Sequence, residues 1–173
     1  MKDQICILAV IILTVAAAFG QKVSPVSTAV KKAVETFERE KFDPLRDPKL
    51  DLEKAVEKTI KSGKRIILDV GGEWCGWCVF MDKFFVQNPE FARLRDQNFV
   101  WVKVNYSEEN ENSEFLGLYP AASGYPHLYV LDESGKFLHS QDTAPLESGK
   151  GYDLAKFSEF LNTWSVKKPA LLK

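Results

Sequence analysis

Apolar residues recur every three or four positions in several segments of this 173-residue chain, which is the spacing that places them on one face of a helix. The spacing predicts an amphipathic helix over residues 26–40, after which Pro44 and Pro48 break the pattern and indicate a linker. Four later segments carry the same spacing and are predicted as helices: residues 52–62, 80–88, 111–119 and 154–164.

Short apolar or alternating runs between these segments predict the strands. Residues 66–70 form a β-branched run of the kind that fills a central strand buried on both faces. Residues 99–104 alternate and predict a strand with two occupied faces. Residues 128–131 and 137–140 flank a turn at 132–135, and together they predict a hairpin.

The order of the predicted elements indicates an α/β fold. A start of strand, helix and strand implies a parallel pair with a right-handed crossover, and the hairpin adds antiparallel strands. We therefore expect a central mixed sheet with helices on both faces and an extra N-terminal helix.

The first twenty residues have the pattern of a secretory signal peptide. Lys2 precedes an apolar run over residues 5–19, and small side chains stand at Ala18 and Gly20, as a signal peptidase requires. The run has 15 residues, fewer than the roughly 20 that span a bilayer as a helix, so cleavage after about Gly20 is favoured over an uncleaved anchor. Export is therefore expected.

The rest of the chain divides into two parts. Residues 21–48 are predicted as an N-terminal helical extension and linker, and residues 49–168 as one domain long enough to bury a core. The charges nearly balance, with 23 Lys and Arg against 24 Asp and Glu and a formal net charge of −1. This balance gives no electrostatic attraction to nucleic acid, so we expect no nucleic-acid partner.

Three cysteines are present, and removal of Cys6 with the signal peptide would leave Cys75 and Cys78. A secreted chain that relies on structural disulfides usually spreads several pairs across its loops. A bridge across so short a loop also removes little chain entropy. The pair is therefore interpreted as chemically active.

Two metal sites that use this cysteine spacing are disfavoured. Covalent haem attachment requires a histidine directly after the second cysteine, where this chain has Val79. A zinc site requires about four ligands, and only His127 and His139 are present to join the cysteines, at an unsuitable separation. We expect no metal site.

The cysteine motif lies at a predicted junction between a strand and a helix. Cys75 would then occupy the helix N-terminus, where unpaired backbone N–H groups and the helix dipole favour the thiolate. Cys78 lies one turn along on the same face, within reach of a mixed disulfide. We expect Cys75 to be the nucleophile and Cys78 the resolving thiol, and the pair stores two electrons without any further cofactor.

Four motifs together resemble thioredoxins, in the family's order and at similar separations: Ile67–Val70, Glu73–Cys78, Val102–Asn105 and Gly124–Pro126. The resemblance covers about residues 50–165, and the chain is also similar to the exported thioredoxin-like proteins of bacteria. It implies a thioredoxin-like three-layer sandwich with thiol–disulfide oxidoreductase activity outside the cytoplasm, in the periplasm. It further implies a monomer that acts on protein thiols or disulfides and is recycled by an exported or membrane redox partner.

The resemblance also assigns roles around the cysteines. Asp69 interrupts an apolar strand and matches a buried family acid that assists proton transfer at the second cysteine. Lys103 matches a lysine that pairs with this acid, the alternative being that both lie at a water-exposed edge. Pro126 matches a cis-proline, which would present the Tyr125 backbone beside Cys75 for pairing with an extended substrate segment.

Two positions depart from the family pattern. The dipeptide between the cysteines is Gly76-Trp77, where thioredoxins typically have Gly-Pro, and this argues against a strong-reductant role. Gly71 stands where thioredoxins usually carry an aromatic residue, which predicts a more open surface beside the site.

Exposed aromatic residues are expected near the motif. Trp74, Trp77 and Tyr125 are predicted to form an apolar docking patch for partner proteins, with Gly76 as a further contact. His127 follows the proline and is a candidate for contact with the substrate, although a lone histidine before a strand is more often an ordinary polar residue.

The favoured function is a thiol–disulfide oxidoreductase, with the direction of electron flow left open. The alternative is a non-catalytic thioredoxin-fold binding module in which the disulfide is permanent. A peroxide-reducing enzyme on the same scaffold ranks last, because no supporting Thr/Arg-type peroxide site is recognisable in the sequence.

Overall fold

The structure, a computed structural model, describes residues 39–166. The predicted signal peptide, most of the predicted helix over 26–40 and residues 167–173 lie outside the described residues. Residues 39 and 40, the end of that predicted helix, are in neither a helix nor a strand. Within residues 39–166, no helix combines the length and the apolar character that crossing a lipid bilayer requires.

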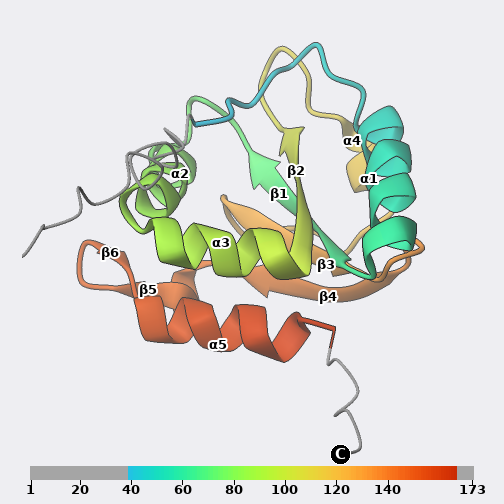
Figure 1. The fold of residues 1–173 in the computed structure, drawn as a ribbon. Coiled ribbons are helices and arrows are strands. Elements are labelled where there is room, and N and C mark those ends of the chain that lie inside the picture. Colours follow the sequence, from blue (N-terminus) through green and yellow to red (C-terminus); the bar gives the residue numbers. More distant parts are fainter. Residues whose placement is uncertain (1–38, 167–173) are drawn as a thin grey trace, which may run out of the picture. The chain divides into compact units, whose positions relative to one another are not determined.

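Four strands form the central sheet in the order β2-β1-β3-β4 (Figure 1). β1 (Arg65–Gly71) pairs in parallel with β2 (Phe99–Asn105), which confirms the predicted start of strand, helix and strand. β3 (His127–Leu131) runs antiparallel to β1 and forms the predicted hairpin with β4 (Phe137–Asp142).

Helices cover both faces of this sheet, which confirms the predicted α/β architecture (Figure 1). Two helices, α1 and α4, lie on one face, and α2, α3 and α5 lie on the other. Their bounds are α1 (Pro48–Ser62), α2 (Gly76–Gln87), α3 (Pro89–Asn98), α4 (Ser113–Leu116) and α5 (Leu154–Trp164).

Local signals in the sequence set the ends of α1. The Asp47 carboxylate accepts a hydrogen bond from the Lys49 backbone N–H at 2.8 Å, and Pro48 stands at the first position, where an N–H would be unpaired anyway. Gly63 ends the helix at a φ of +66°, a conformation that glycine adopts without steric cost.

Two elements go beyond what hydrophobic spacing predicts. Pro89 both follows α2 and begins α3, because the first position of a helix tolerates proline. Only Phe91 and Ala92 of α3 are buried, which is too few to produce a helical pattern in the sequence. A two-stranded ribbon, β5 (Glu147–Ser148) with β6 (Gly151–Tyr152), precedes α5.

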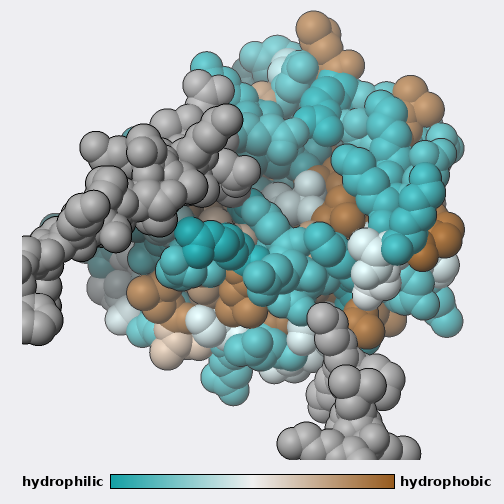
Figure 2. Space-filling model, in the orientation of Figure 1, coloured by the Kyte–Doolittle hydropathy of each residue, from teal (hydrophilic) through white to brown (hydrophobic). Residues whose placement is uncertain are grey.

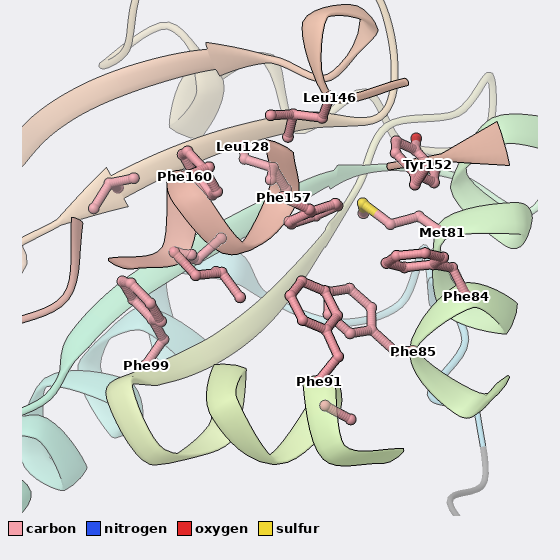
Figure 3. Packing of buried hydrophobic residues seen from close by; sticks show 14 residues of the cluster. Met81, Phe84, Phe85, Phe91, Phe99, Leu128, Leu146, Tyr152, Phe157 and Phe160 are labelled. Atoms are coloured by element: carbon pink, nitrogen blue, oxygen red, sulfur yellow. The ribbon is translucent and has the colours of Figure 1, made fainter. Parts of the chain in front are cut away.

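The two faces of the sheet bury different side chains. On the side of α2, α3 and α5 the core is aromatic, and Figure 3 shows the rings of Phe85, Phe91 and Phe157 meeting there. The other core is mainly aliphatic and takes Ile66, Leu68 and Val70 from β1. On the face drawn in Figure 2, hydrophobic residues form separate groups within a mainly hydrophilic surface.

Alternation along β1 determines where its polar residue points. Side chains two positions apart lie on the same face of a sheet, so Asp69 shares a face with Ile67, which belongs to the aromatic core. Gly71, the last residue of β1, follows on that face. The carboxylate of Asp69 therefore lies under the α2 side of the sheet, in line with the cysteine motif.

Candidate active site

The cysteine motif lies where β1 ends and α2 begins, as the sequence predicts. Cys75 is the N-cap of α2, with φ of −86° and ψ of 106°, and forms a disulfide with Cys78. The Cys75 Sγ accepts a hydrogen bond from the Cys78 backbone N–H at 3.1 Å. An unpaired N–H at a helix start stabilises negative charge, so this geometry favours a Cys75 thiolate once the bond is reduced.

The two sulfurs differ in exposure. Cys75 is 5% exposed, whereas Cys78 is completely buried, with 0% exposure. Of the two cysteines, Cys75 is therefore the more accessible to solvent.

Cys78 is enclosed partly by Gly71 and partly by Phe42. An ideal Cβ at Gly71 would lie 2.5 Å from the Cys78 Sγ and 3.2 Å from the Phe42 Cζ, so only glycine fits there without displacing a neighbour. Phe42 is 3% exposed and packs with Cys75 and Cys78 in one cluster. The prediction of a more open surface at Gly71 is wrong, because a ring from a distant segment occupies this place.

A backbone hydrogen bond holds Phe42 in position, and ion pairs hold the nearby Arg39. The Phe42 backbone N–H donates to the Glu73 Oε1 at 3.0 Å, and Arg39 donates to the same oxygen at 2.8 Å. Arg39 also donates to the Asp82 Oδ2 at 3.2 Å. The Arg39 hydrogen bond is the main cause that lowers the pKa of Glu73, against the effect of partial burial. Residues 39–42 are called the N-terminal strap below.

Three charged residues form a buried charge cluster on the α2 side of the sheet: Asp69, Asp82 and Lys103, exposed by 0%, 8% and 6%. The Lys103 Nζ donates to the Asp69 Oδ2 at 2.9 Å and to the Asp82 Oδ1 at 2.7 Å. The predicted pairing of Asp69 with Lys103 is present, and neither lies at a water-exposed edge. Trp101 donates its Nε1–H to the Asp69 Oδ2 at 3.0 Å, while the Asp69 Oδ1 has no hydrogen-bond partner within residues 39–166.

Burial and charge act in opposite directions in this cluster. Burial alone would lower the pKa of Lys103, but Asp69 and Asp82 outweigh it and the pKa is raised, so the amine stays protonated. Burial raises the pKa of Asp82, against the attraction of Lys103. The cluster thus holds one fixed cation beside a carboxyl group that takes up a proton more readily than usual.

Asp82 is a site residue that the sequence analysis missed. It lies one turn after Cys78 on α2, among the buried residues Met81, Phe84 and Phe85. The signal was present, because a carboxylate inside an apolar helix is costly unless it is paired.

The predicted cis-proline is confirmed. The Tyr125–Pro126 bond is cis, and Pro126 is buried, with its carbonyl accepting a hydrogen bond from the Thr143 Oγ1 at 2.8 Å. Tyr125 packs against the cluster of Phe42, Cys75 and Cys78. The segment that precedes β3 therefore lies beside the disulfide.

The predicted aromatic patch consists of two groups. Trp74 is 59% exposed, donates its Nε1–H to the Tyr106 carbonyl at 2.6 Å, and meets Tyr125 at a centroid distance of 5.9 Å. Tyr125 in turn stacks on Tyr106 at 4.7 Å. Trp77 belongs to the second group, which Phe80 and Tyr152 complete. Sequence reasoning missed Tyr106, Phe80 and Tyr152, which lie outside the motif.

Gly76 lies between Trp74 and Trp77 in the sequence. It is exposed, and a Cβ added there would have no atom within 4 Å. The start of α2 is therefore bare beside Cys75, which leaves room for a partner's backbone.

A cleft adjoins the Trp74 group. Its walls include Phe42, Pro44, Trp74 and Tyr106, and its rim carries four glutamates, Glu73, Glu108, Glu109 and Glu111. The cleft therefore offers apolar surface directly next to the cysteine motif.

The structure gives His127 a different place from the one predicted. The residue is 3% exposed, its Nε2 is 2.7 Å from the Ser140 Oγ, and its ring contacts Tyr129. Burial is the main cause that lowers its pKa. No part of the ring is available to a substrate, so the prediction of substrate contact is wrong. His139 stacks on Trp164 at a centroid distance of 4.4 Å.

A model of the thioredoxin-like family matches residues 47–133, which is half of the chain. The disulfide bond reductase DsbH of Chlamydia pneumoniae is 29% identical over 93 residues, 49% of this chain and 55% of that protein. Human spermatogenesis-associated protein 20 is 41% identical over 56 residues, 32% of this chain and 7% of that protein. The chain thus spans about half of the first relative's length and a small part of the second's.

Two solved structures share the fold. A disulphide isomerase from Xylella fastidiosa Temecula1 gives a TM-score of 0.61 at 22% identity, over 70% of this chain and 94% of that chain. A DsbH oxidoreductase gives a TM-score of 0.52 at 21% identity, over 83% of this chain and 92% of that chain. With the family match over residues 47–133 and the Cys75–Cys78 pair at the start of α2, the chain belongs to the thioredoxin-like family.

Proposed function

We propose that this protein is a thiol–disulfide oxidoreductase that exchanges disulfides with other proteins outside the cytoplasm. The observation that carries the proposal is the unequal burial of two bonded cysteines at a helix start: Cys75 keeps 5% exposure and Cys78 has none. A purely stabilising disulfide requires no such difference, whereas stepwise exchange requires one attacking and one protected thiol.

In the first step the reduced protein attacks a client disulfide. The Cys75 thiolate bonds to one client sulfur, the client S–S bond breaks, and the other client sulfur leaves as a thiolate that takes a proton from water. The helix start stabilises the attacking thiolate, because the Cys78 N–H already points at the Cys75 Sγ. The product is a mixed disulfide between Cys75 and the client.

In the second step Cys78 releases the client. Its thiol loses a proton, the resulting thiolate bonds to the Cys75 sulfur, and the bond from Cys75 to the client breaks to free the second client thiolate. The cysteine pair has then lost two electrons and the client has gained them. The pair carries the electrons itself, so the proposal requires no cofactor.

Asp69 is assigned as the acceptor of the Cys78 proton. It precedes Gly71 by two residues on the same strand face, a rise of about 7 Å, and Gly71 abuts the Cys78 sulfur. Its Oδ1 is free to accept a hydrogen bond among the described residues. Lys103 limits the cost of a negative charge at Asp69, whereas Asp82 shares that lysine and repels the charge.

Client binding is assigned to the surface around Cys75. Trp74, Trp77 and the open backbone at Gly76 surround the attacking sulfur, and Tyr125 next to Pro126 offers a backbone edge for an extended client segment. Hydrophobic and main-chain contacts of this kind accept many sequences, which suits a monomer that serves several protein substrates.

The direction of electron flow is proposed as reducing. The relative at 29% identity is a disulfide bond reductase, and its match includes half of this chain. A reductase outside the cytoplasm requires an exported or membrane-bound dithiol donor, because each turnover leaves the Cys75–Cys78 pair oxidised. The apolar run over residues 5–19 supports export.

Equilibration with glutathione tests both the activity and its direction. The purified protein is held in defined glutathione buffers, and the free thiols at Cys75 and Cys78 are counted by alkylation and mass spectrometry. A potential at or below about −230 mV supports the reductase, whereas a value of about −180 to −120 mV points to an isomerase or an oxidant. A pair that never exchanges contradicts the proposal and favours a binding module.

Two serine variants assign the roles of the sulfurs. Cys75→Ser should lower the rate of client reduction about 1,000-fold or more, because an alcohol replaces the nucleophile. Cys78→Ser should instead accumulate the mixed disulfide, which non-reducing gels detect. Accumulation in Cys75→Ser and not in Cys78→Ser would reverse the assignment.

Export is tested separately. The full chain is expressed in a bacterial host, and the mature N-terminus is sequenced from the periplasmic fraction. We expect it to begin at about residue 21.

A further inference from the structure

Phe42 contacts the disulfide from outside the family-matched segment, which begins at residue 47. Its ring packs with both cysteines, and its Cζ lies 3.2 Å from the position that a Gly71 side chain would occupy. The Lys103 Nζ lies over the face of the same ring, 3.9 Å from its centroid. One aromatic side chain therefore touches both the cysteine pair and the buried charge cluster.

We propose that Phe42 is a positioning residue that determines which sulfur reacts, by closing the Cys78 side of the pair to water and to incoming thiols. The proposal deepens the proposed function, because regioselective exchange depends on it. The Phe42 ring already packs against the cysteine pair in the folded chain, so the proposal requires no partner or ligand.

The chemistry of the surroundings explains how a ring has this effect. A buried thiol in an apolar pocket resists ionisation, since burial penalises the charged form. The backbone of β1 at Gly71 closes one approach to the Cys78 sulfur, because no side-chain atom could fit between them. Phe42 packs against the cysteine pair beside that glycine. Loss of the ring would admit water and remove the barrier between Cys78 and the Lys103 ammonium, and both changes favour a Cys78 thiolate.

Hydrogen bonds and ion pairs of the N-terminal strap hold the Phe42 ring in this position. Phe42 itself is anchored through its backbone N–H to Glu73, and Arg39 is bound to Glu73 and Asp82. Glu73 is the second residue before Cys75, and Asp82 is the fourth after Cys78. Both anchors thus lie on the segment that carries the cysteines, so the strap is tied directly to the redox segment.

Thiol labelling of the reduced protein tests the proposal. The protein is reduced, pulsed with iodoacetamide over a pH series, and digested; fragment ions between the two cysteines assign the label to Cys75 or Cys78. In the wild-type protein Cys78 should react at least about 100-fold more slowly than Cys75, because it is buried and un-ionised. Phe42→Ala should raise the Cys78 rate at least about tenfold and move its pH midpoint downward, with the Cys75 rate changed little.

Two further variants separate shielding from a general loss of structure. Phe42→Leu keeps an apolar side chain and should preserve slow Cys78 labelling. Phe115→Ala removes an equally buried ring, also 3% exposed, from the core on the opposite face of the sheet, and should leave Cys78 labelling unchanged. An equal rise in Phe115→Ala and Phe42→Ala would overturn the proposal, because it would mean that any core defect exposes Cys78.

Arg39→Gln covers the possibility that Phe42→Ala does not fold. Arg39 lies at the start of the strap and belongs to none of the hydrophobic core clusters, so Arg39→Gln is a milder change than loss of the buried ring. Release of the strap should raise Cys78 labelling by several-fold, less than Phe42→Ala. If Cys75 still reacts, the inference is refuted when the Cys78 labelling rate does not rise in Arg39→Gln or in a folded Phe42→Ala. An unreactive Cys75 would instead contradict the proposed function.

Discussion

Different kinds of side chain surround the two cysteines of the disulfide. On the Cys75 side are exposed aromatic rings and the bare helix start at Gly76, with Trp74 59% exposed. On the Cys78 side are Phe42 and, over its ring, a buried lysine held by two carboxylates. The difference supports the proposed division of roles, in which Cys75 meets the client and Cys78 carries out the intramolecular step.

The two sides also differ in where they come from along the chain. The Cys75 side is largely local, since Trp74, Gly76 and Trp77 are within two residues of the nucleophile. The Cys78 side is assembled from remote segments, and its contacts join residues 21 to 43 positions apart in the sequence. Substitutions on the first side should therefore change client recognition, and those on the second should change stability and proton chemistry.

The largest expected effect lies on the closed side, at Lys103. Lys103→Met leaves Asp69 and Asp82 without their shared cation and should lower the free energy of unfolding by about 3–5 kcal/mol at pH 7, measured by urea denaturation. The deficit should shrink as the pH falls, because protonation removes the unpaired negative charge.

Lys49 provides the matched control for this prediction. It pairs with Glu114 at the surface, where the side chains are 51% and 87% exposed. Lys49→Met should leave the stability unchanged within the error of the same urea titration, because exposed ion pairs contribute little. Similar losses in the two variants would mean that burial does not distinguish the cluster.

A smaller effect is expected on the open side, at Trp74. Trp74→Ala should lower kcat/KM toward a protein disulfide about tenfold, or about 1.4 kcal/mol, because a large exposed ring beside the nucleophile is lost. The rate with a small disulfide such as oxidised glutathione should stay within about twofold, because the chemical step does not use the indole.

Ile60→Ala is the control for Trp74. Ile60 is 68% exposed on α1, near the start of β1 and so at the end of that strand opposite the cysteine motif. It should leave both rates unchanged. Trp77→Ala should show a weaker form of the Trp74 effect, because Trp77 is 37% exposed and packs on Phe80 and Tyr152. Equal loss of rate with protein and small disulfides would place Trp74 in the chemistry instead.

The smallest effect concerns pH and His127, which follows the proline beside the disulfide. Burial lowers the pKa of His127 below its ordinary value of 6.5, with Asp142 opposing and His139 adding to the shift. Below pH 6.5 the unfolded chain therefore binds a proton at His127 more readily than the folded chain does. The contribution of His127 to the free energy of unfolding is complete above pH 6.5 and is lost as the pH falls below it.

His127→Gln should remove this part of the acid sensitivity between pH 7 and pH 5.5, as measured by urea denaturation at each pH. His139→Gln should retain most of it, because burial, the main cause of the lowered His127 pKa, is unchanged and only the smaller contribution of His139 is lost. Unchanged acid sensitivity in His127→Gln would show that another group titrates in this window.

Much of the fold could be predicted because local signals agree with the final packing. The apolar run of β1, the alternation of β2 and the turn between β3 and β4 each encode an element that the structure contains. The sequence analysis did not predict α3, because only Phe91 and Ala92 are buried and the amphipathic pattern of the helix is therefore weak. His127 was misjudged because sequence neighbours do not show whether a residue at the start of a strand points outward or inward.

The sequence by itself determined the redox pair and its place at a helix start, because spacing within one turn is set by local geometry. The family resemblance indicated the acid and the lysine near it. Only the tertiary structure decided what covers Cys78. Phe42 reaches the site through a chain reversal that joins distant segments, and a trace of that packing in the sequence is the glycine at position 71, where a side chain would displace the ring and the sulfur. Asp82 lies on the same helix as Cys78, but the tertiary structure brings Lys103 to it.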